Sequence, residues 1–383
     1  MIEKRCKYIG IFFVNTSQQK DTFGCPFLLT LFGPVRAVEG AKPYGRGARK
    51  SLTHIEIPSL SCYNDIRKHT IRTEGYGMKL KFDVAGKHQP DPFIFEDGGK
   101  LYLYVTAPRG VEAYSADDLF GIWHYEGIVA SFEGRRDYWA PSVIKYGDNY
   151  YLYVSCSTDS EFQYMHAAAA NSPLGPFTGE KCFYKRFSID SHVVETADGL
   201  FLWYAEDNVA CERIGTRVFV DRLLDPMTPA NAPKEVIVPT MDREIFKRNR
   251  FGDGRDWHTI EGAFWFSEGD WQYLMYSGGC FENSSYHIGY AAAHTNEQDL
   301  TRVEFVKHTL DGAFDPVMIK NDFEEGSGHH SVIKYKGQYY AIYHARDYAS
   351  DAREEYAEAR TARVCKLHVQ NGIITAERYA DRI

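Results

Sequence analysis

The chain has 383 residues, of which 44% are hydrophobic and 15% aromatic, with 27 Tyr and 24 Phe. This length suits one large β-architecture with an extension or two domains, and the aromatic content favours sheets over helical bundles. The formal net charge of −8 is spread along the chain, which argues against nucleic acid and anionic membrane as partners and favours a neutral substrate.

The N-terminal part of the chain does not share the pattern of the rest. Its first fifty positions hold nine Lys/Arg against three Asp/Glu, and KPYGRGARKSL is typical of a basic linker. We therefore predict an irregular extension over residues 1–75, poorly packed or disordered, followed by one domain over residues 76–383.

The cellular compartment is indicated by the N-terminus and the cysteines. The chain starts with basic residues and a short apolar run but has no small-residue cleavage site, and no apolar stretch is long enough to span a membrane. The eight cysteines are irregularly spaced and form no CxxC pair, which favours reduced thiols over disulfides or a zinc site. We expect a cytoplasmic protein.

From residue 91 onward the chain repeats one pattern, in which a polar head is followed by an apolar strand, a turn and a Tyr-rich strand. The repeat length is about fifty residues early and about seventy later, within the range of propeller blades with insertions. The five repeats are DPFIFEDGGKLYLYVTA from Asp91, APSVIKYGDNYYLYVSCS from Ala140, DSHVVETADGLFLWYAED from Asp190, EGAFWFSEGDWQYLMYSGG from Glu261 and HHSVIKYKGQYYAIYHARD from His329.

Further short strands between these hairpins complete the predicted units. Residues 124–131 and 286–294 are two of them, giving roughly four strands per unit. Helical periodicity is scarce, and its best candidate, 351–361, is expected to be an insertion. The predicted fold is all-β, a five-bladed β-propeller with an irregular N-terminal extension; a β-sandwich is the alternative. A strand within 78–86 would close the ring by pairing with the last blade.

The heads of the repeats are the candidate functional residues. The innermost strand of each blade lines the central channel, so that the residues at its start converge near one mouth. Taken singly, each has a structural explanation, such as a turn at Asp91 before proline, a cap at Asp190 or a turn at Glu261. Clustered carboxylates repel one another, however, and their burial is costly unless a cation or a reaction uses them. Their recurrence at corresponding points of the repeats favours a shared functional site.

These motifs resemble glycoside hydrolase family 43, five-bladed propeller enzymes that remove arabinofuranosyl or xylosyl units from plant polysaccharides. The resemblance covers about 85–383 and implies a general base at Asp91 in HQPDPFIF and a general acid at Glu261 in IEGAFWF. It implies that Asp190 in SIDSHVV orients the acid and tunes its pKa. In GSGHHSV it implies that His329 reaches a metal, often calcium, in the central channel.

Two departures from the family motifs leave the subfamily open. Ala263 follows Glu-Gly where many members have proline, and Ser191-His192 stands where Pro-Ser is frequent. Neither departure removes a catalytic group.

The chemistry of acetal cleavage assigns a task to each carboxyl group. The departing oxygen needs a proton, which Glu261 would supply because its apolar neighbours Phe264 and Trp265 should raise its pKa. Asp91 would stay ionised and activate a water. The resemblance implies inversion of configuration, for which the two carboxyls stand roughly 6.5–9.5 Å apart.

Sugars bind by stacking on aromatic rings and by hydrogen bonds to their hydroxyls. For each candidate, core packing or a surface ion pair is the alternative explanation. The candidate substrate-binding residues are Phe93, Trp139, Trp257, His258, His330, Arg346 and Arg363.

We thus expect an inverting hydrolase that releases α-L-arabinofuranosyl or β-xylosyl units from plant-derived oligosaccharides. Exo action requires loops that block one end of the mouth, for which 208–258 and 295–328 are candidates. Two alternatives are a non-catalytic sugar-binding propeller and a propeller glycoside phosphorylase. A phosphorylase needs a cationic phosphate pocket, and the head motifs contain no Arg/Lys cluster.

Overall fold

The structure, a computed structural model, describes residues 78–158, 162–347 and 359–378. The predicted extension over 1–75 and most of the helix candidate at 351–361 lie outside these ranges. Apart from one turn of 3-10 helix, η1 (Asp242–Glu244), the elements of the described residues are strands. None of the helices in these ranges is both long and apolar enough to cross a bilayer.

Four antiparallel units follow the predicted hairpins along the first three-quarters of the chain, and we call them blades I to IV. Blade I comprises β3 (Phe93–Asp97), β4 (Lys100–Val105), β5 (Val111–Ala116) and β6 (Ile122–Ala130), with β2 (Lys81–Phe82) paired to β6. Blade II comprises β7 (Arg136–Tyr146), β8 (Asn149–Ser157), β9 (Tyr164–Ala170) and β10 (Thr178–Cys182). Blade III comprises β11 (Ile189–Thr196), β12 (Gly199–Asn208) and β13 (Gly215–Asp225), with β14 (Thr228–Pro229) and β15 (Lys234–Ile237) paired to β13. Blade IV comprises β17 (Trp257–Glu268), β18 (Trp271–Gly278), β19 (His287–His294) and β20 (Val306–Lys307), with β16 (Ile245–Lys247) paired to β17.

The last unit, blade V, is completed by the N-terminal strand of the described chain. It comprises β21 (Glu324–Tyr335), β22 (Gln338–Asp347) and β23 (Thr361–Gln370), with β24 (Ile373–Glu377) and β1 (Met78–Lys79) both paired to β23. Met78 pairs with Val364 in blade V, and Lys81, three residues later, pairs with Ile122 in blade I. The segment 78–82 therefore links the last blade to the first, which confirms the predicted ring closure.

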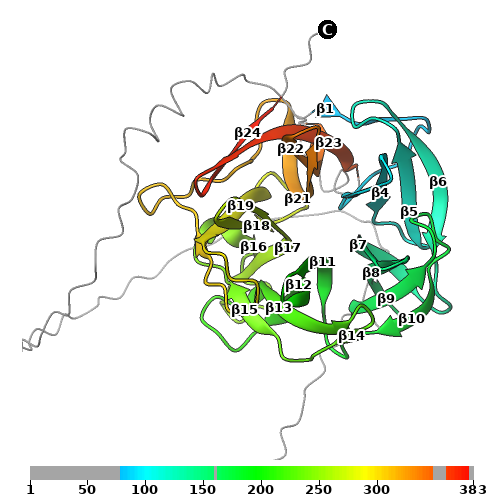
Figure 1. The fold of residues 1–383 in the computed structure, drawn as a ribbon. Helices are drawn as coiled ribbons and strands as arrows, with labels where there is room; N and C mark the ends of the chain where they lie inside the picture. The colour runs from blue at the N-terminus through cyan, green and yellow to red at the C-terminus, as the bar shows by residue number, and fades with distance from the viewer. Residues whose placement is uncertain (1–77, 159–161, 348–358, 379–383) are drawn as a thin grey trace, which may run out of the picture. The chain divides into compact units, whose positions relative to one another are not determined.

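The blades form a ring, as predicted (Figure 1). The first strands of successive blades contact one another in the order β3, β7, β11, β17 and β21, and β21 in turn contacts β3. Blades III and IV count as one ten-stranded sheet because Gly215 and Thr216 pair in parallel with His258 and Thr259. The segment 208–258 was a candidate for the loop that blocks one end of the mouth. Much of it is strand, because β13 and β15 lie in it and complete blade III.

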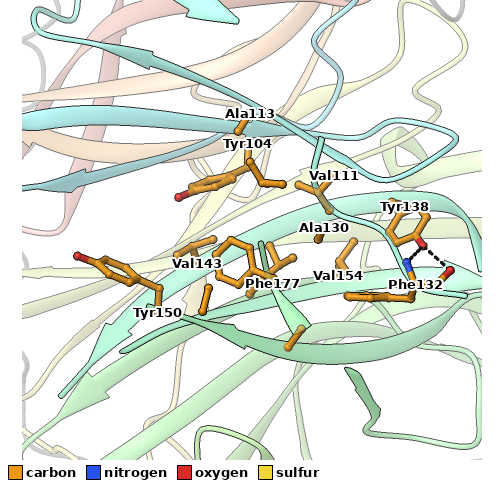
Figure 2. Packing of buried hydrophobic residues seen from close by; sticks show 14 of the residues in the cluster. Tyr104, Val111, Ala113, Ala130, Phe132, Tyr138, Val143, Tyr150, Val154 and Phe177 are labelled. Atoms are coloured by element: carbon orange, nitrogen blue, oxygen red, sulfur yellow. Dashed lines mark hydrogen bonds between the residues drawn. The ribbon is translucent and has the colours of Figure 1, made fainter. Parts of the chain in front are cut away.

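The core lies between the blades. One cluster of buried hydrophobic residues occupies each of the five interfaces between neighbouring blades. Figure 2 shows the cluster between blades I and II, where the Tyr138 hydroxyl accepts a hydrogen bond from the Phe132 N–H and donates to the Phe132 carbonyl. Both faces of a blade are thus covered, which explains why middle strands such as β12 have continuous apolar runs instead of alternation.

A buried ion network fixes the ring closure in blade V. Glu324 at the start of β21 accepts hydrogen bonds from Arg363 Nη1 at 2.9 Å and from the Tyr343 hydroxyl at 2.8 Å. Arg363 also binds Asp347, and Asp347 pairs with Lys79 of β1. These contacts tie the strand β1 to the blade that it completes.

Replacing Arg363 with methionine is expected to lower the free energy of unfolding by about 3 kcal/mol, because Glu324 would keep a buried charge without its main partner. Urea unfolding followed by tryptophan fluorescence measures this change. Lys145→Ala is the control, because it removes an exposed ion pair with Asp97 and should leave the midpoint unchanged. An unchanged midpoint for Arg363→Met would show that the network adds nothing to stability.

Candidate active site

The heads of the inner strands share an unusual backbone conformation. Positive φ angles occur at Asp91 (52°), Ala140 (46°), Asp190 (63°), Gly262 (59°) and His329 (40°). In blades II to V the pairing register shifts at the same points, as expected for β-bulges, which redirect side chains at the rims of sheets. In blade IV the left-handed residue is Gly262, so that Glu261 lies one position before the equivalent point.

The heads meet at one cavity of about 560 Å³. Asp91, Asp190, Glu261 and His329 all line it, although the chain separates them widely. The cavity is also lined by Lys87, Thr106, Trp139, Phe281, Tyr286 and Arg360. The predicted convergence of the polar heads is therefore present in the structure.

Three hydrogen bonds hold Asp91, two of them donated to its carboxylate and one donated by its backbone N–H. The Thr106 hydroxyl donates to Asp91 Oδ2 at 2.6 Å and itself accepts a hydrogen bond from the Ala140 N–H at 2.8 Å. Arg360 Nη1 donates to Asp91 Oδ1 at 3.3 Å, and the Asp91 N–H donates to His344 Nδ1 at 3.1 Å. Ala140, the head without a functional side chain, thus contributes through its backbone.

The charge state of Asp91 follows from these neighbours. Burial by itself raises the pKa of the Asp91 carboxyl, but Arg360, followed by His329 and His344, brings the pKa well below its usual range. Burial lowers the pKa of both histidines, that of His344 to about 3. Arg360 is therefore the neighbour that carries a full positive charge at neutral pH, and it keeps Asp91 ionised.

Glu261 and Asp190 have the opposite electrostatic character. Burial raises the pKa of Glu261 to about 7; a hydrogen bond from Tyr286 opposes this rise, and repulsion from Asp91 adds to it. The pKa of Asp190 is raised well above its usual range, first by burial and then by repulsion from Glu261 and Asp91. Asp190 Oδ2 accepts a hydrogen bond from the Gly262 N–H at 3.0 Å, which fixes the backbone next to Glu261. The cavity is therefore faced by an ionised carboxyl, Asp91, and by two carboxyls with raised pKa values, Glu261 and Asp190, and acid–base catalysis needs such a difference between acid and base.

His329 lies between the carboxylates. Its ring atom Nδ1 is 3.4 Å from Asp91 Oδ1 and 3.9 Å from Asp190 Oδ2. Its backbone N–H donates to the Ser277 hydroxyl at 2.8 Å. A Cβ atom at Gly262 would lie 3.3 Å from His329 Nδ1, so that the glycine leaves room for the imidazole.

His329, the residue predicted to reach a metal, lines both the large cavity and a smaller one beside His330. Calcium takes six to eight oxygen ligands, whereas the small cavity beside His329 and His330 has a volume of about 10 Å³, enough for roughly one water. Across the described ranges, no three His, Cys, Asp or Glu side chains are grouped as metal ligands. Calcium in the central channel stays a prediction, and no step of the mechanism below depends on it.

Two of the predicted aromatic contacts lie in the channel. Trp139 lines the large cavity with 41% of its surface exposed. Phe93 lies deeper, against His192 and Phe264, and lines the small cavity together with His330. Both ring nitrogens of His330 are buried without a hydrogen-bond partner.

The other predicted substrate-binding residues do not line the large cavity. Trp257 is buried against Phe251, and His258 Nε2 lies 2.9 Å from Arg213 Nη1. Arg346 is buried and donates to the Phe281 carbonyl, and Arg363 belongs to the ion network of blade V.

Among the cavity residues that were missed in the sequence are Thr106, Phe281, Tyr286 and Arg360. Each lies in the connection that follows the second strand of a blade, after β4, β18 or β22. Because the first two strands are antiparallel, the second strand ends where the first begins, and this connection lies beside the heads. The hairpin geometry is the signal that would have indicated these segments.

Comparisons with known proteins agree with this architecture. Residues 84–374 match the family described as glycosyl hydrolases family 43. A probable arabinan endo-1,5-α-L-arabinosidase A from Aspergillus flavus is 26% identical over 200 residues, which are 49% of this chain and 57% of that relative, so that the match spans little more than half of its length. A xylosidase/arabinosidase from Bacteroides ovatus is 24% identical over 349 residues, covering 78% of this chain and 97% of the relative.

Solved structures show the same fold. A thermostable family-43 glycoside hydrolase aligns with a TM-score of 0.66 and 24% identity, covering 80% of this chain and 96% of the other. The α-L-arabinanase of Cellvibrio cellulosa, solved with arabinohexaose, aligns with a TM-score of 0.58 and 18% identity, covering 76% of this chain and 96% of the other.

Proposed function

The chain belongs to glycosyl hydrolase family 43, and on this basis we propose that it is an inverting glycosidase that releases terminal α-L-arabinofuranosyl or β-xylosyl units from plant-derived oligosaccharides. The observation that carries the proposal is the pairing of Asp91 and Glu261 in one cavity, with the pKa of the first lowered and that of the second raised to about 7. Near neutral pH, such a pair supplies a base and an acid together.

The mechanism assigns one proton transfer to each of these two carboxyls. Asp91 takes a proton from a water as the water oxygen bonds to the anomeric carbon. Glu261 gives its proton to the glycosidic oxygen as the bond between that oxygen and the anomeric carbon breaks. Asp190 accepts a hydrogen bond from the Gly262 N–H and in this way holds the position of Glu261.

The remaining lining residues suit the binding of a sugar. The aromatic residues Trp139 and Phe281 line the cavity, and Thr106 and Arg360 orient the base. The pentose specificity rests on the names of the relatives, one an arabinosidase and another a xylosidase/arabinosidase.

The alternatives have weaker support. A sugar-binding propeller without activity has no need of oppositely tuned carboxyls. A phosphorylase needs cations that are available to phosphate, whereas Lys87 pairs with Glu112 and Arg360 pairs with Asp91.

A panel of nitrophenyl pentosides tests the proposal, with the anomer of the released sugar followed by proton NMR. We expect hydrolysis of the α-L-arabinofuranoside or the β-xyloside, with the opposite anomer formed first. Oligosaccharide digests that yield single pentoses distinguish terminal release from internal cleavage. Binding without turnover, or release of a sugar phosphate only when phosphate is present, would overturn the proposal in favour of one of the alternatives.

The pH dependence of kcat/KM is expected to be bell-shaped, with its alkaline limb near pH 7. Activity falls as the pH rises through this value because Glu261, whose pKa burial raises to about 7, loses the proton that it must donate. The acid limb lies at a pH below the ordinary pKa range of a carboxyl group. Arg360, His329 and His344 hold the pKa of Asp91 low despite its burial. An alkaline limb near pH 4 to 5 would contradict this assignment of the acid.

A further inference from the structure

Tyr286 makes the one hydrogen bond to the Glu261 carboxyl that the described residues provide. Its hydroxyl donates to Glu261 Oε1 at 2.7 Å, and its side chain is buried, with 1% of its surface exposed. Tyr286 lies in the connection between β18 and β19, directly before His287, and so comes from the blade that carries the acid.

The tyrosine ring is fixed on two sides. It stacks almost parallel to His344, with an interplanar angle of 10° and a centroid distance of 5.8 Å. Gly328 of β21 lies against another part of the ring, where an added Cβ would come within 2.0 Å of a ring carbon. The absence of a side chain at Gly328 therefore makes room for the ring, and the hydroxyl is held on the carboxyl by packing.

Most of the other charged groups near Glu261 raise its pKa, whereas the hydrogen bond from Tyr286 lowers it. Repulsion from Asp91 and Asp207 raises the pKa of Glu261, and Asp190 and the thiol of Cys280 are also near. Arg360 and Tyr286 favour the ionised form of Glu261. Tyr286 donates a hydrogen bond to the Glu261 carboxyl, and Arg360 donates one to Asp91.

We propose that Tyr286 is a positioning residue that holds the Glu261 carboxyl and stabilises the negative charge that Glu261 gains when it protonates the departing oxygen. This inference rests on the proposed function, in which Glu261 is the general acid. The proton that leaves Glu261 moves to the glycosidic oxygen, while Tyr286 keeps its own proton because burial holds the pKa of its hydroxyl well above the usual range. A hydrogen bond to a carboxylate is stronger than one to a neutral acid, so that the contact strengthens as the proton leaves.

Tyr286→Phe keeps the ring between His344 and Gly328 and removes only the hydroxyl. The alkaline limb of kcat/KM is expected to move up by about one pH unit, because the acid loses the donor that favours its ionised form. kcat is expected to fall about tenfold on linkages with poor leaving groups, which corresponds to a loss of about 1.4 kcal/mol of transition-state stabilisation. Aryl pentosides with good leaving groups, which depend little on the acid, should be nearly unaffected.

A second measurement does not depend on turnover. In protein labelled with ¹³C at the glutamate carboxyls, the resonance of Glu261 is assigned by its loss in Glu261→Gln, and its titration is compared between the unaltered chain and Tyr286→Phe. A higher pKa for Glu261 in the variant is expected. An unchanged titration would overturn the inference, whatever the effect of the substitution on activity.

The two proposals fail in different ways. If the unaltered chain hydrolyses no pentoside while the titration of Glu261 still shifts in Tyr286→Phe, the proposed function fails and the contact between the two residues stands. Tyr104→Phe is the matched control, because it removes the hydroxyl of another buried tyrosine, one that donates to the Pro173 carbonyl at 2.6 Å away from the large cavity. Equal shifts of the pH profile in both variants would also overturn the inference.

Discussion

Substitution of Asp91 by alanine is expected to lower kcat by about 10³-fold or more on every pentoside, whether its leaving group is good or poor. Asp91 is the carboxyl that Arg360 keeps ionised, and in the proposed mechanism nothing else in the cavity takes the proton from the attacking water. Attack by water is needed for all substrates, so that a better leaving group does not compensate. Steady-state kinetics on a series of aryl pentosides measures the loss.

Azide provides the control for this variant. As a small anionic nucleophile that needs no base, it should restore turnover of activated substrates by Asp91→Ala and yield a glycosyl azide of inverted configuration. An azide product with retained configuration, or a variant that keeps more than about a tenth of the original kcat, would exclude Asp91 as the base of an inverting reaction.

Glu261→Gln is expected to lose about 10²- to 10⁴-fold in kcat on natural linkages, and much less on substrates whose leaving group departs without a proton. Glutamine has nearly the shape of glutamate but cannot donate an acidic proton. The measurement is the dependence of log kcat on the pKa of the leaving group, which should become steeper in the variant.

The control for Glu261→Gln lies in the same blade. Glu268, the last residue of β17, is half-exposed and pairs with Lys334, and Glu268→Gln should leave both the rates and the slope unchanged. Equal losses on good and poor leaving groups for Glu261→Gln would show that Glu261 does not act as the acid.

The fold could be predicted from the sequence because each blade begins with the same short signals. A hairpin such as β3–β4 needs a turn with positive φ angles, which Gly98 and Gly99 supply at 60° and 80°, and the apolar strands around it recur at similar intervals. Ring closure was predictable for a related reason. Without the segment 78–82, the edges of two blades would stay open, and sheets usually avoid open edges.

The heads of the site were also predictable, because a propeller brings equivalent positions of its repeats together. The rest of the cavity was not. Arg346 and Arg363 are arginines near the end of the repeat, like Arg360, and residue type alone does not distinguish them. Their positions and partners do: Arg346 and Arg363 lie within blade V and pair with glutamates of β21, whereas Arg360 lies before β23, pairs with Asp91 and lines the cavity. Such a difference depends on side-chain direction at the end of a strand, which no repeat pattern encodes.

The left-handed turn at each head has a further consequence for how this architecture can change. The five left-handed residues all line one small cavity of about 10 Å³, and Ala140 is one of them. A carboxylate or imidazole in place of the Ala140 methyl group would have no volume to occupy. The centre of the ring thus has a fixed capacity, and any gain of a new group at one blade requires the loss of bulk at another.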